Sequence, residues 1–175
     1  METGLPTKRN FDQFLRLIFG QILDRLAQER PDQELLAYKD QRTTYGAFYQ
    51  QVLQMATALK RLGIRKGDRV AALFPNRPEF FIMQQACLYI GAVFVLLSTR
   101  YREFKLSYML KHSGARCLFT IGEYMNTNFT DLIGKIKPEL PELKFVFVLG
   151  SDVPNYRSPV ASAFRPPSPP SLRAF

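Results

Sequence analysis

The sequence lacks the clustered glycines that a phosphate-binding loop requires. Its ten glycines are scattered, and no two of them are adjacent or separated by a single residue. A loop that cradles phosphate needs neighbouring glycines, because only they let successive backbone N–H groups turn toward an anion without a Cβ clash. The patterns G-x-x-x-x-G-K-[ST] and G-x-G-x-x-G are both absent. The sequence therefore argues against a self-contained nucleotide-binding domain of either type.

Cysteine and histidine are equally scarce. Cys87 and Cys117 both lie among apolar neighbours, no C-x-x-C spacing occurs, and His112 is the only histidine. We expect two buried free thiols in a reducing cytosol, with a disulfide or a metal-binding pair as the alternative. We assign no metal ligands.

Long apolar segments are also missing. No apolar run reaches roughly 18 residues, the least that spans a membrane as a helix. The start of the chain, from Met1 to Asn10, is mixed polar and lacks the apolar stretch of a secretory signal. A length of 175 residues with 46% hydrophobic content suits one globular domain. We therefore expect a cytoplasmic protein without a transmembrane helix.

The net charge of +9 raises the question of nucleic-acid binding. Lys and Arg are scattered, however, and the densest groups are Lys60-Arg61 and Arg65-Lys66, on either side of one turn. The sequence shows no interleaving of aromatic and basic residues of the kind that stacks bases. We expect no nucleic-acid partner, whereas a diffuse basic surface favours acidic ligands or anionic lipid headgroups.

Residues 1–31 predict an amphipathic helix. Asn10 is a suitable N-cap, apolar residues recur at helical spacing from Phe11 to Leu26, and Pro31 ends the run. The polar face mixes acidic and basic residues, so a helix packed on the domain is the first interpretation. A helix lying on a membrane surface, and with it a peripheral membrane contact, is the alternative.

Residues 32–150 alternate between short apolar runs and helical patterns. Strands are predicted at 35–39, 69–74, 92–97, 115–121 and 144–149, and helices at 45–62, 78–90, 102–112 and 124–137. A turn is predicted at Asp40-Gln41-Arg42, and the run at 92–97 is expected to be a buried strand. Short connections imply βαβ units, so the predicted fold is α/β, a partial and mostly parallel sheet with flanking helices.

Residues 151–175 differ from the rest in composition. Five of the chain's twelve prolines and four serines fall between Ser158 and Phe175, without periodicity. Proline lacks a backbone N–H and fixes φ, so this tail is expected to be disordered and to add neither a strand nor a long helix. A polyproline II ligand at 166–170 is the alternative.

Six short segments occur along the domain in an order typical of one enzyme superfamily. They are Thr44-Tyr45, the stretch from Ala56 to Gly63, Gly67-Asp68-Arg69-Val70, Pro75-Asn76-Arg77-Pro78-Glu79-Phe80, Gly91-Ala92-Val93 and Ser113-Gly114-Ala115-Arg116. Together they resemble the amino-terminal part of the AMP-binding, adenylate-forming acyl-CoA synthetase-like superfamily. No single segment is specific for this superfamily, but the occurrence of all six in the same order along the chain is.

The resemblance implies a two-step reaction on a carboxylic or fatty acid. The carboxylate attacks the α-phosphate of ATP to give an acyl-adenylate and pyrophosphate, and the thiol of coenzyme A then displaces AMP. In the family, the phosphates and Mg²⁺ are held by a Ser/Thr/Gly-rich loop, later strands and a small carboxy-terminal domain. All of these would lie beyond Phe175, so we expect a fragment that is inactive alone and binds none of ATP, Mg²⁺ and coenzyme A tightly.

One residue of the resemblance is a candidate cofactor contact. The family often has Asn-Pro-Arg after the G-A-V strand, where the arginine can reach a phosphate of coenzyme A, and this sequence has Ser98-Thr99-Arg100. A guanidinium suits phosphate, so Arg100 is the one cofactor-binding residue that we assign, against the plainer interpretation of a solvated loop arginine. Asn76 is interpreted as a turn residue. We assign no catalytic residue.

Two functional hypotheses from different classes remain. The first is a fragment of an AMP-dependent ligase, and the second is a non-catalytic α/β binding module with a Pro-rich tail. In either case the predicted sheet is apolar along most of its strands and needs cover on both faces and at its edges. We therefore expect self-association, because an exposed apolar patch above roughly 600 Å² is unusual for a soluble monomer.

Overall fold

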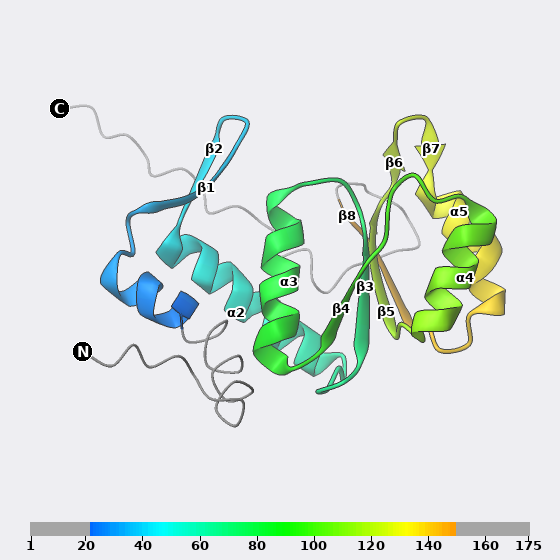
Figure 1. Ribbon diagram of the computed structural model, residues 1–175, viewed down its shortest axis with the longest axis horizontal. Coiled ribbons are helices and arrows are strands. Elements are labelled where there is room, and N and C mark those ends of the chain that lie inside the picture. The colour runs from blue at the N-terminus through cyan, green and yellow to red at the C-terminus, as the bar shows by residue number, and fades with distance from the viewer. Residues whose placement is uncertain (1–21, 150–175) are drawn as a thin grey trace, which may run out of the picture.

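The computed structural model describes residues 22–149, in which a parallel sheet lies between two layers of helices (Figure 1). The sheet contains β3 (Arg69–Leu73), β4 (Val93–Leu96), β5 (Cys117–Ile121) and β8 (Phe145–Leu149). The helices are α2 (Tyr45–Arg61), α3 (Pro78–Ile90), α4 (Glu103–Ser113) and α5 (Phe129–Ile136), followed by a 3₁₀ turn (Lys137–Glu139). Residues 22–29 form a helix before them.

Two small hairpins accompany the sheet. Antiparallel pairs are formed by β1 (Glu34–Tyr38) with β2 (Gln41–Thr44) and by β6 (Glu123–Tyr124) with β7 (Thr127–Asn128). The first hairpin precedes α2, and the second lies between β5 and α5. Both project beyond the end of the sheet at which the parallel strands finish (Figure 1).

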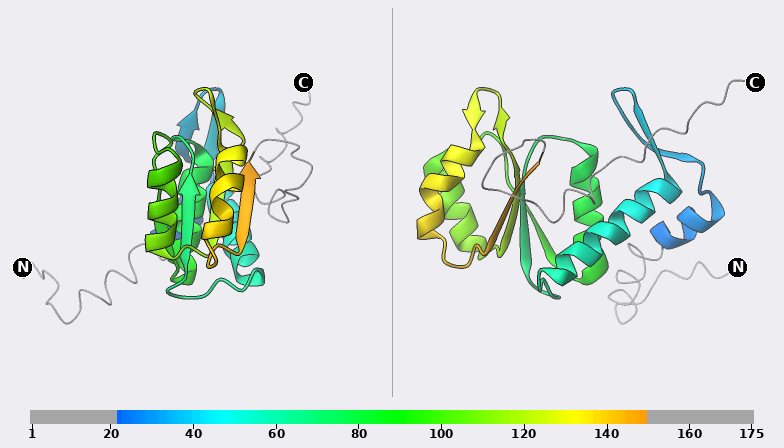
Figure 2. Two further views of the ribbon diagram at one scale, coloured as in Figure 1. Left: turned by 90° about the vertical axis from the view of Figure 1, so that its right-hand side faces the viewer. Right: turned by 180° about the vertical axis from the view of Figure 1, so that it is seen from behind.

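The order of strands in the sheet is β4-β3-β5-β8, and all neighbours are parallel. The chain moves from β3 to β4 in one direction and then crosses back over β3 to reach β5. Because parallel crossovers are right-handed, this reversal places the connecting helices on opposite faces. Accordingly, α2 and α3 cover one face while α4 and α5 cover the other (Figure 2). The α/β fold predicted from the sequence is confirmed.

Capping residues set the ends of the helices where the sequence predicted them. The hydroxyl of Thr44 accepts a hydrogen bond from the Ala47 N–H at 3.3 Å, which begins α2. Pro78 occupies the first turn of α3, where its missing N–H costs no hydrogen bond. Gly63 and Gly91 follow α2 and α3 with φ of 78° and 73°, a left-handed conformation that glycine adopts without strain.

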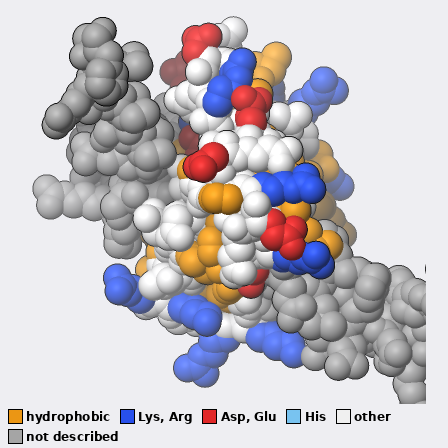
Figure 3. Space-filling model, turned by 90° about the vertical axis from the view of Figure 1, so that its left-hand side faces the viewer, with side chains coloured by type: hydrophobic (Ala, Val, Ile, Leu, Met, Phe, Trp, Pro, Cys, Tyr) orange, Lys and Arg blue, Asp and Glu red, His pale blue; other side chains and the backbone are white. Residues whose placement is uncertain are grey.

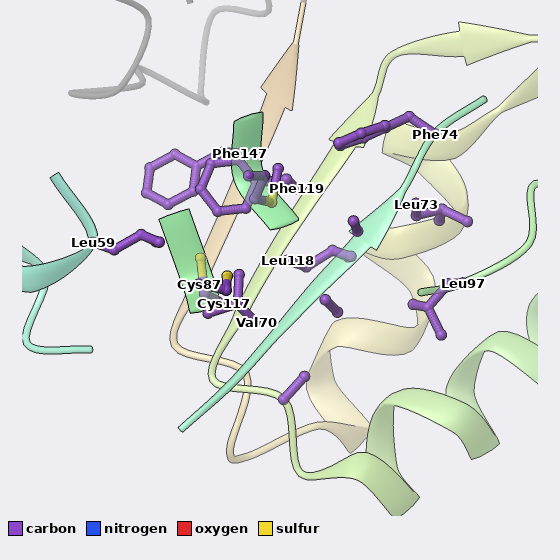
Figure 4. Packing of buried hydrophobic residues seen from close by; sticks show 14 of the residues in the cluster. Leu59, Val70, Leu73, Phe74, Cys87, Leu97, Cys117, Leu118, Phe119 and Phe147 are labelled. Atoms are coloured by element: carbon purple, nitrogen blue, oxygen red, sulfur yellow. The ribbon is translucent and has the colours of Figure 1, made fainter. Parts of the chain in front are cut away.

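The core lies on both faces of the sheet. Phe119 and Phe147 stack at 4.9 Å on the side of α2 and α3, and Cys87 and Cys117 meet beside them (Figure 4). Both cysteines are buried, as the sequence predicted. Burial raises the pKa of the Cys87 thiol to about 12, because a thiolate would lose its solvation there. This thiol therefore stays protonated and behaves as a small apolar side chain.

Three sequence predictions about the elements are wrong. Gln41 and Arg42 belong to strand β2 rather than to a turn, and the turn itself contains Lys39 with φ of 53°. The predicted helix at 124–137 begins only at Phe129, because Met125 and Asn126 both adopt positive φ and close the β6–β7 hairpin. Among residues 22–149, strand β4 is not a buried strand but forms an edge of the sheet, and its apolar side chains are partly exposed.

The remaining organisational predictions lie mostly outside the described residues. These include the N-cap at Asn10, the first part of the amphipathic helix of residues 1–31, and the tail at 151–175. Within residues 22–149, no helix is long and apolar enough to cross a membrane.

Candidate functional site

The segments that carry the family resemblance divide between the two ends of the sheet. In a parallel sheet all strands start at one edge, here the amino edge, and finish at the other, the carboxyl edge. The segments 67–70 and 113–116 lie at the amino edge, at the starts of β3 and β5. The segments 75–80 and 98–100 lie at the carboxyl edge, after β3 and β4.

At the amino edge, Arg69 joins the start of β3 to the end of α4. Its Nε donates to the Ser113 carbonyl at 2.9 Å, and its Nη2 donates to the Gly114 carbonyl at 2.8 Å. The last carbonyls of a helix have no partner within the helix, so the guanidinium satisfies groups that would otherwise need water. Gly114 has φ of 58°, and a Cβ added there would lie 2.7 Å from Arg69 Nη2.

Asp68 provides the second link at the amino edge. Its Oδ2 accepts hydrogen bonds from the Arg65 N–H at 2.8 Å and from Arg116 Nη1 at 2.6 Å. Burial alone would raise the pKa of Asp68, but the hydrogen bonds from Arg65 and Arg116, with the charges of Arg116 and Arg69, lower it overall. The polar groups of both segments are thus directed at one another, and their role at this edge is structural.

The carboxyl edge is the open end of the fold. The loop after β3 leads to α3 on one face, whereas the loop after β5 leads to α5 on the other. In open α/β sheets, ligands bind where neighbouring loops leave in opposite directions. Here that position lies between the end of β3, with Pro75 and Asn76, and the end of β5, with Gly122 and Glu123. The exposed Asn76 lies in the turn, where the sequence placed it.

The turn after β3 is braced by charge and by aromatic packing. Arg77 and Glu79 form a two-point ion pair, with Nη2–Oε1 at 2.7 Å and Nε–Oε2 at 3.1 Å. The Glu79 hydrogen bond is the main cause of a raised pKa at Arg77. The ring of Phe80 meets those of Phe74 and Phe94 edge to face. Sequence reasoning missed this ion pair, for which the close spacing of Arg and Glu around a proline was the available signal.

Arg100 lies in the loop from β4 to α4, also at the carboxyl edge. Its backbone N–H donates to Ser98 Oγ at 3.2 Å, while Arg102 Nη1 donates to the carbonyls of Thr99, Arg100 and Tyr101 at 3.3–3.4 Å. The backbone of this loop is therefore held by its own side chains. The exposed guanidinium of Arg100 has no hydrogen bond or ion pair with any residue of the described range.

Within residues 22–149 there is no group of three or more His, Cys, Asp or Glu side chains that could hold a metal ion. The glycines with positive φ in this range, Gly63, Gly67, Gly91 and Gly114, all lie at the amino edge. None of them therefore lines the carboxyl edge, where a phosphate-binding loop of this fold class would lie.

Comparison with known proteins finds acyl-CoA synthetases and ligases among the relatives. The chain is 36% identical over 134 residues to YngI of Bacillus subtilis (strain 168), which is named as an acyl-CoA synthetase. The matched residues make up 75% of this chain and 24% of that protein. The chain is 31% identical over 123 residues to the mitochondrial medium-chain acyl-CoA ligase ACSF2 of Pongo abelii, with 69% and 20% covered.

A solved structure agrees with these relatives. The crystal structure of the anthranilate CoA ligase AuaEII, in complex with anthranoyl-AMP, matches with a TM-score of 0.69 at 28% identity. The match covers 75% of this chain and 25% of that one, so the chain spans about a quarter or less of the proteins named here. Residues 23–171 match the AMP-binding enzyme family, and the chain therefore belongs to this family of adenylate-forming acyl-CoA ligases.

Proposed function

We propose that this chain forms the amino-terminal framework of an AMP-dependent acyl-CoA ligase. Such an enzyme activates a carboxylic or fatty acid with ATP to an acyl-adenylate and then transfers the acyl group to coenzyme A. The observation that carries the proposal is the family match over residues 23–171, together with the matching solved structure. The names of the relatives support a carboxylic acid as the substrate class.

Within such a ligase, the described residues act as a structural part. The amino edge is held together by Arg69, Asp68 and Arg116, and the carboxyl edge presents the braced turns after β3 and β4. The chemistry requires Mg²⁺, cationic groups and backbone N–H donors around the phosphates, and residues 22–149 contain no group of three or more His, Cys, Asp or Glu side chains that could hold a metal ion. The 175-residue chain alone is therefore proposed to be inactive in acyl-adenylate formation.

ATP–pyrophosphate exchange tests this proposal directly. The purified chain is incubated with ATP, Mg²⁺ and labelled pyrophosphate in the presence of a panel of fatty and aromatic acids. We expect no exchange above the background without acid. Acid-dependent exchange that disappears on heating would contradict the proposed inactivity and would place a complete adenylation site within these residues.

Arg100 is the proposed contact for a phosphate of coenzyme A. Support comes from its exposed, unpaired guanidinium at the carboxyl edge and from its place in the family pattern. Ligand-detected NMR with coenzyme A provides the test, because it registers weak binding. Arg100→Ala is expected to weaken the signal, whereas Lys39→Ala, on the β1–β2 turn, is not. Equal signals from the two variants would remove Arg100 from the site.

A further inference from the structure

The amino edge of the sheet carries a concentration of exposed basic side chains. Six of them, here called the basic edge, come from the end of α2, the α2–β3 turn, the end of α4 and the segment before β8. They are Lys60, Arg61, Arg65, Lys66, Lys111 and Lys144, and all six are exposed. Because these elements are distant in sequence, only the fold brings the charges together.

Backbone contacts fix the connections of the amino edge beside one another. The Gly67 N–H donates to the Gly91 carbonyl at 2.8 Å, which joins the turns before β3 and β4. The Lys144 N–H donates to the Arg116 carbonyl at 2.8 Å, which joins the segments before β8 and β5. With the Arg69 contacts to the end of α4, these bonds make one continuous surface. Lys and Arg side chains project from this lower end of the molecule in the space-filling view (Figure 3).

The basic edge is not neutralised by neighbouring acids. Asp68 and Glu142 are the acidic residues in the segments 60–69, 88–93, 111–116 and 141–144 that form this surface. Asp68 is already paired with Arg116. None of the six basic side chains takes part in an ion pair within the described residues. The surface therefore has an excess of positive charge facing solvent.

Apolar side chains are interspersed with these charges. Leu88, near the end of α3, is 42% exposed, and Val93, at the start of β4, is 48% exposed. Gly91 lies between Leu88 and Val93 in the chain, and the aliphatic part of Lys66 packs against it. A Cβ added at Gly91 would lie 3.0 Å from Lys66 Cγ. Aliphatic groups that flank snorkelling lysines are the combination that inserts among lipid headgroups.

We propose that the basic edge docks this protein on an anionic lipid bilayer. Lys and Arg near a membrane surface attract acidic headgroups, and the exposed Leu88 and Val93 add a shallow apolar contact. Single-stranded nucleic acid is less well matched, because base stacking needs free aromatic faces beside the charges. The exposed aromatic rings of this surface already have partners: the Tyr89 hydroxyl donates to Asp24 Oδ1 at 3.4 Å, and His112 stacks on Tyr108. This surface lies opposite the carboxyl edge and does not depend on the proposed ligase activity.

Vesicle flotation of the full chain tests the proposal. In a density gradient, bound protein rises with the vesicles while aggregated protein sinks, so self-association does not mimic binding. We expect the chain to rise with vesicles of phosphatidylcholine containing phosphatidylglycerol and to remain below with phosphatidylcholine alone. Binding should weaken as salt is raised, because the attraction is screened.

Charge-matched variants locate the binding surface. Arg61→Glu with Arg65→Glu reverses two charges of the basic edge and is expected to lower the partition coefficient by at least about tenfold. Lys39→Glu with Lys105→Glu changes the net charge equally, but these residues lie toward the carboxyl edge, so little change is expected. Leu88→Ser is expected to leave binding more salt-sensitive, and Met125→Ser on the β6–β7 turn is its control. Circular dichroism verifies that each variant is folded.

Three results would overturn the proposal. These are equal flotation with neutral and anionic vesicles, an equal loss of binding in both charge variants, and tight binding of a labelled RNA without flotation. The last of these would assign the basic edge to nucleic acid instead. Each result is independent of ATP–pyrophosphate exchange, so a failure here leaves the proposed ligase framework untouched.

Discussion

Gly114 is the residue at which two backbone and packing constraints coincide. Its φ of 58° is left-handed, and the space where a Cβ would lie is taken by Arg69 Nη2 at 2.7 Å. Gly114→Ala therefore adds conformational strain and also displaces a guanidinium that caps α4. We expect a loss of about 1–3 kcal/mol in the free energy of unfolding, measured by urea denaturation.

Gly134→Ala is the matched control for this prediction. Gly134 lies exposed in helix α5, and an added Cβ would meet nothing within 4 Å. Alanine is favoured over glycine within a helix, so a gain of about 0.5–1 kcal/mol is expected. If the two variants lost stability equally, the Arg69 contact would not explain the requirement for glycine at position 114.

Asp68 provides a prediction for the pH dependence of stability. Its pKa is lowered in the folded protein, so the folded state binds this proton less tightly than the unfolded state does. The stabilisation is full above the usual carboxyl pKa of about 3.9 and is lost as the pH falls through the lower folded value. Asp68→Asn is expected to cost about 1–2 kcal/mol at neutral pH.

The same variant should show a flatter profile in acid. Below about pH 4, the free energy of unfolding of the parent protein falls, because the carboxyl group of the unfolded state binds a proton before Asp68 of the folded state does. The asparagine variant lacks this component. Urea denaturation at a series of pH values measures both slopes. Identical slopes in the parent and the variant would show that the links to Arg65 and Arg116 contribute nothing through charge.

At this scale the sequence predicted residue types better than their partners. Gly67, Asp68, Arg69, Gly114 and Arg116 could be quoted from the chain as family-like segments. That they bind one another across the amino edge depends on the order of the strands, which brings residues more than forty positions apart into contact. The position of Arg100 after a predicted strand could be read from the sequence. Whether its side chain has a partner within residues 22–149 depends on which segments the fold places beside it, and the sequence alone does not show this.

Strand β4 is the element whose environment most affects the behaviour of the protein. It is an edge strand, and Leu96 is 59% exposed, while its neighbour Leu97 is 1% exposed. Exposed apolar edges pair with other chains, and a lysine on such an edge discourages this. Leu96→Lys is expected to reduce self-association in light scattering while changing the free energy of unfolding by less than about 0.5 kcal/mol.

Leu97→Lys is the contrasting variant one position further on. It would bury an unpaired ammonium group in the core, so the chain is expected to be unfolded by circular dichroism. If Leu96→Lys also unfolded the protein, the side chain at position 96 would have to be buried in solution, in contrast to its exposure in the structure. Should Leu96→Lys leave self-association unchanged, the edge of β4 would not be the surface that associates.

The pattern of apolar residues predicted best those elements that are mostly buried in the core. Helix α3 has the bounds expected from Pro78 and Gly91, and β3, β5 and β8 agree within two residues. Strand β1 was predicted within one residue, but its partner β2 escaped prediction because it is polar. The β6–β7 hairpin escaped because its turn uses Met and Asn rather than glycine at positive φ. The exposure of β4 escaped as well, since an apolar run indicates a strand but not its place in the sheet.

At the scale of the whole molecule, the two ends of one sheet carry different exposed groups. The amino edge is bound internally by Arg69 and Asp68 and presents the basic edge to solvent. The carboxyl edge keeps the braced turns and the unpaired Arg100. Because both ends depend on the same four strands, loss of the sheet would abolish the proposed lipid docking and the proposed cofactor contact together, whereas the surface variants above separate them.

The final prediction concerns the state of the isolated chain in solution. Large apolar side chains are exposed on separate elements of the described residues, among them Leu96 on β4, Phe104 and Tyr108 on α4, and Met125 on the β6–β7 turn. Such surface marks an interface or an aggregation risk. We expect a folded chain with helical far-UV circular dichroism that binds a hydrophobic dye and self-associates as its concentration rises. Light scattering and dye fluorescence over a dilution series measure both effects, and Phe104→Ser, which removes an 87% exposed ring, should lower the dye signal. A monodisperse monomer that binds no dye and melts in one sharp transition would contradict this expectation, and it would favour a self-sufficient binding module over the framework of a larger ligase.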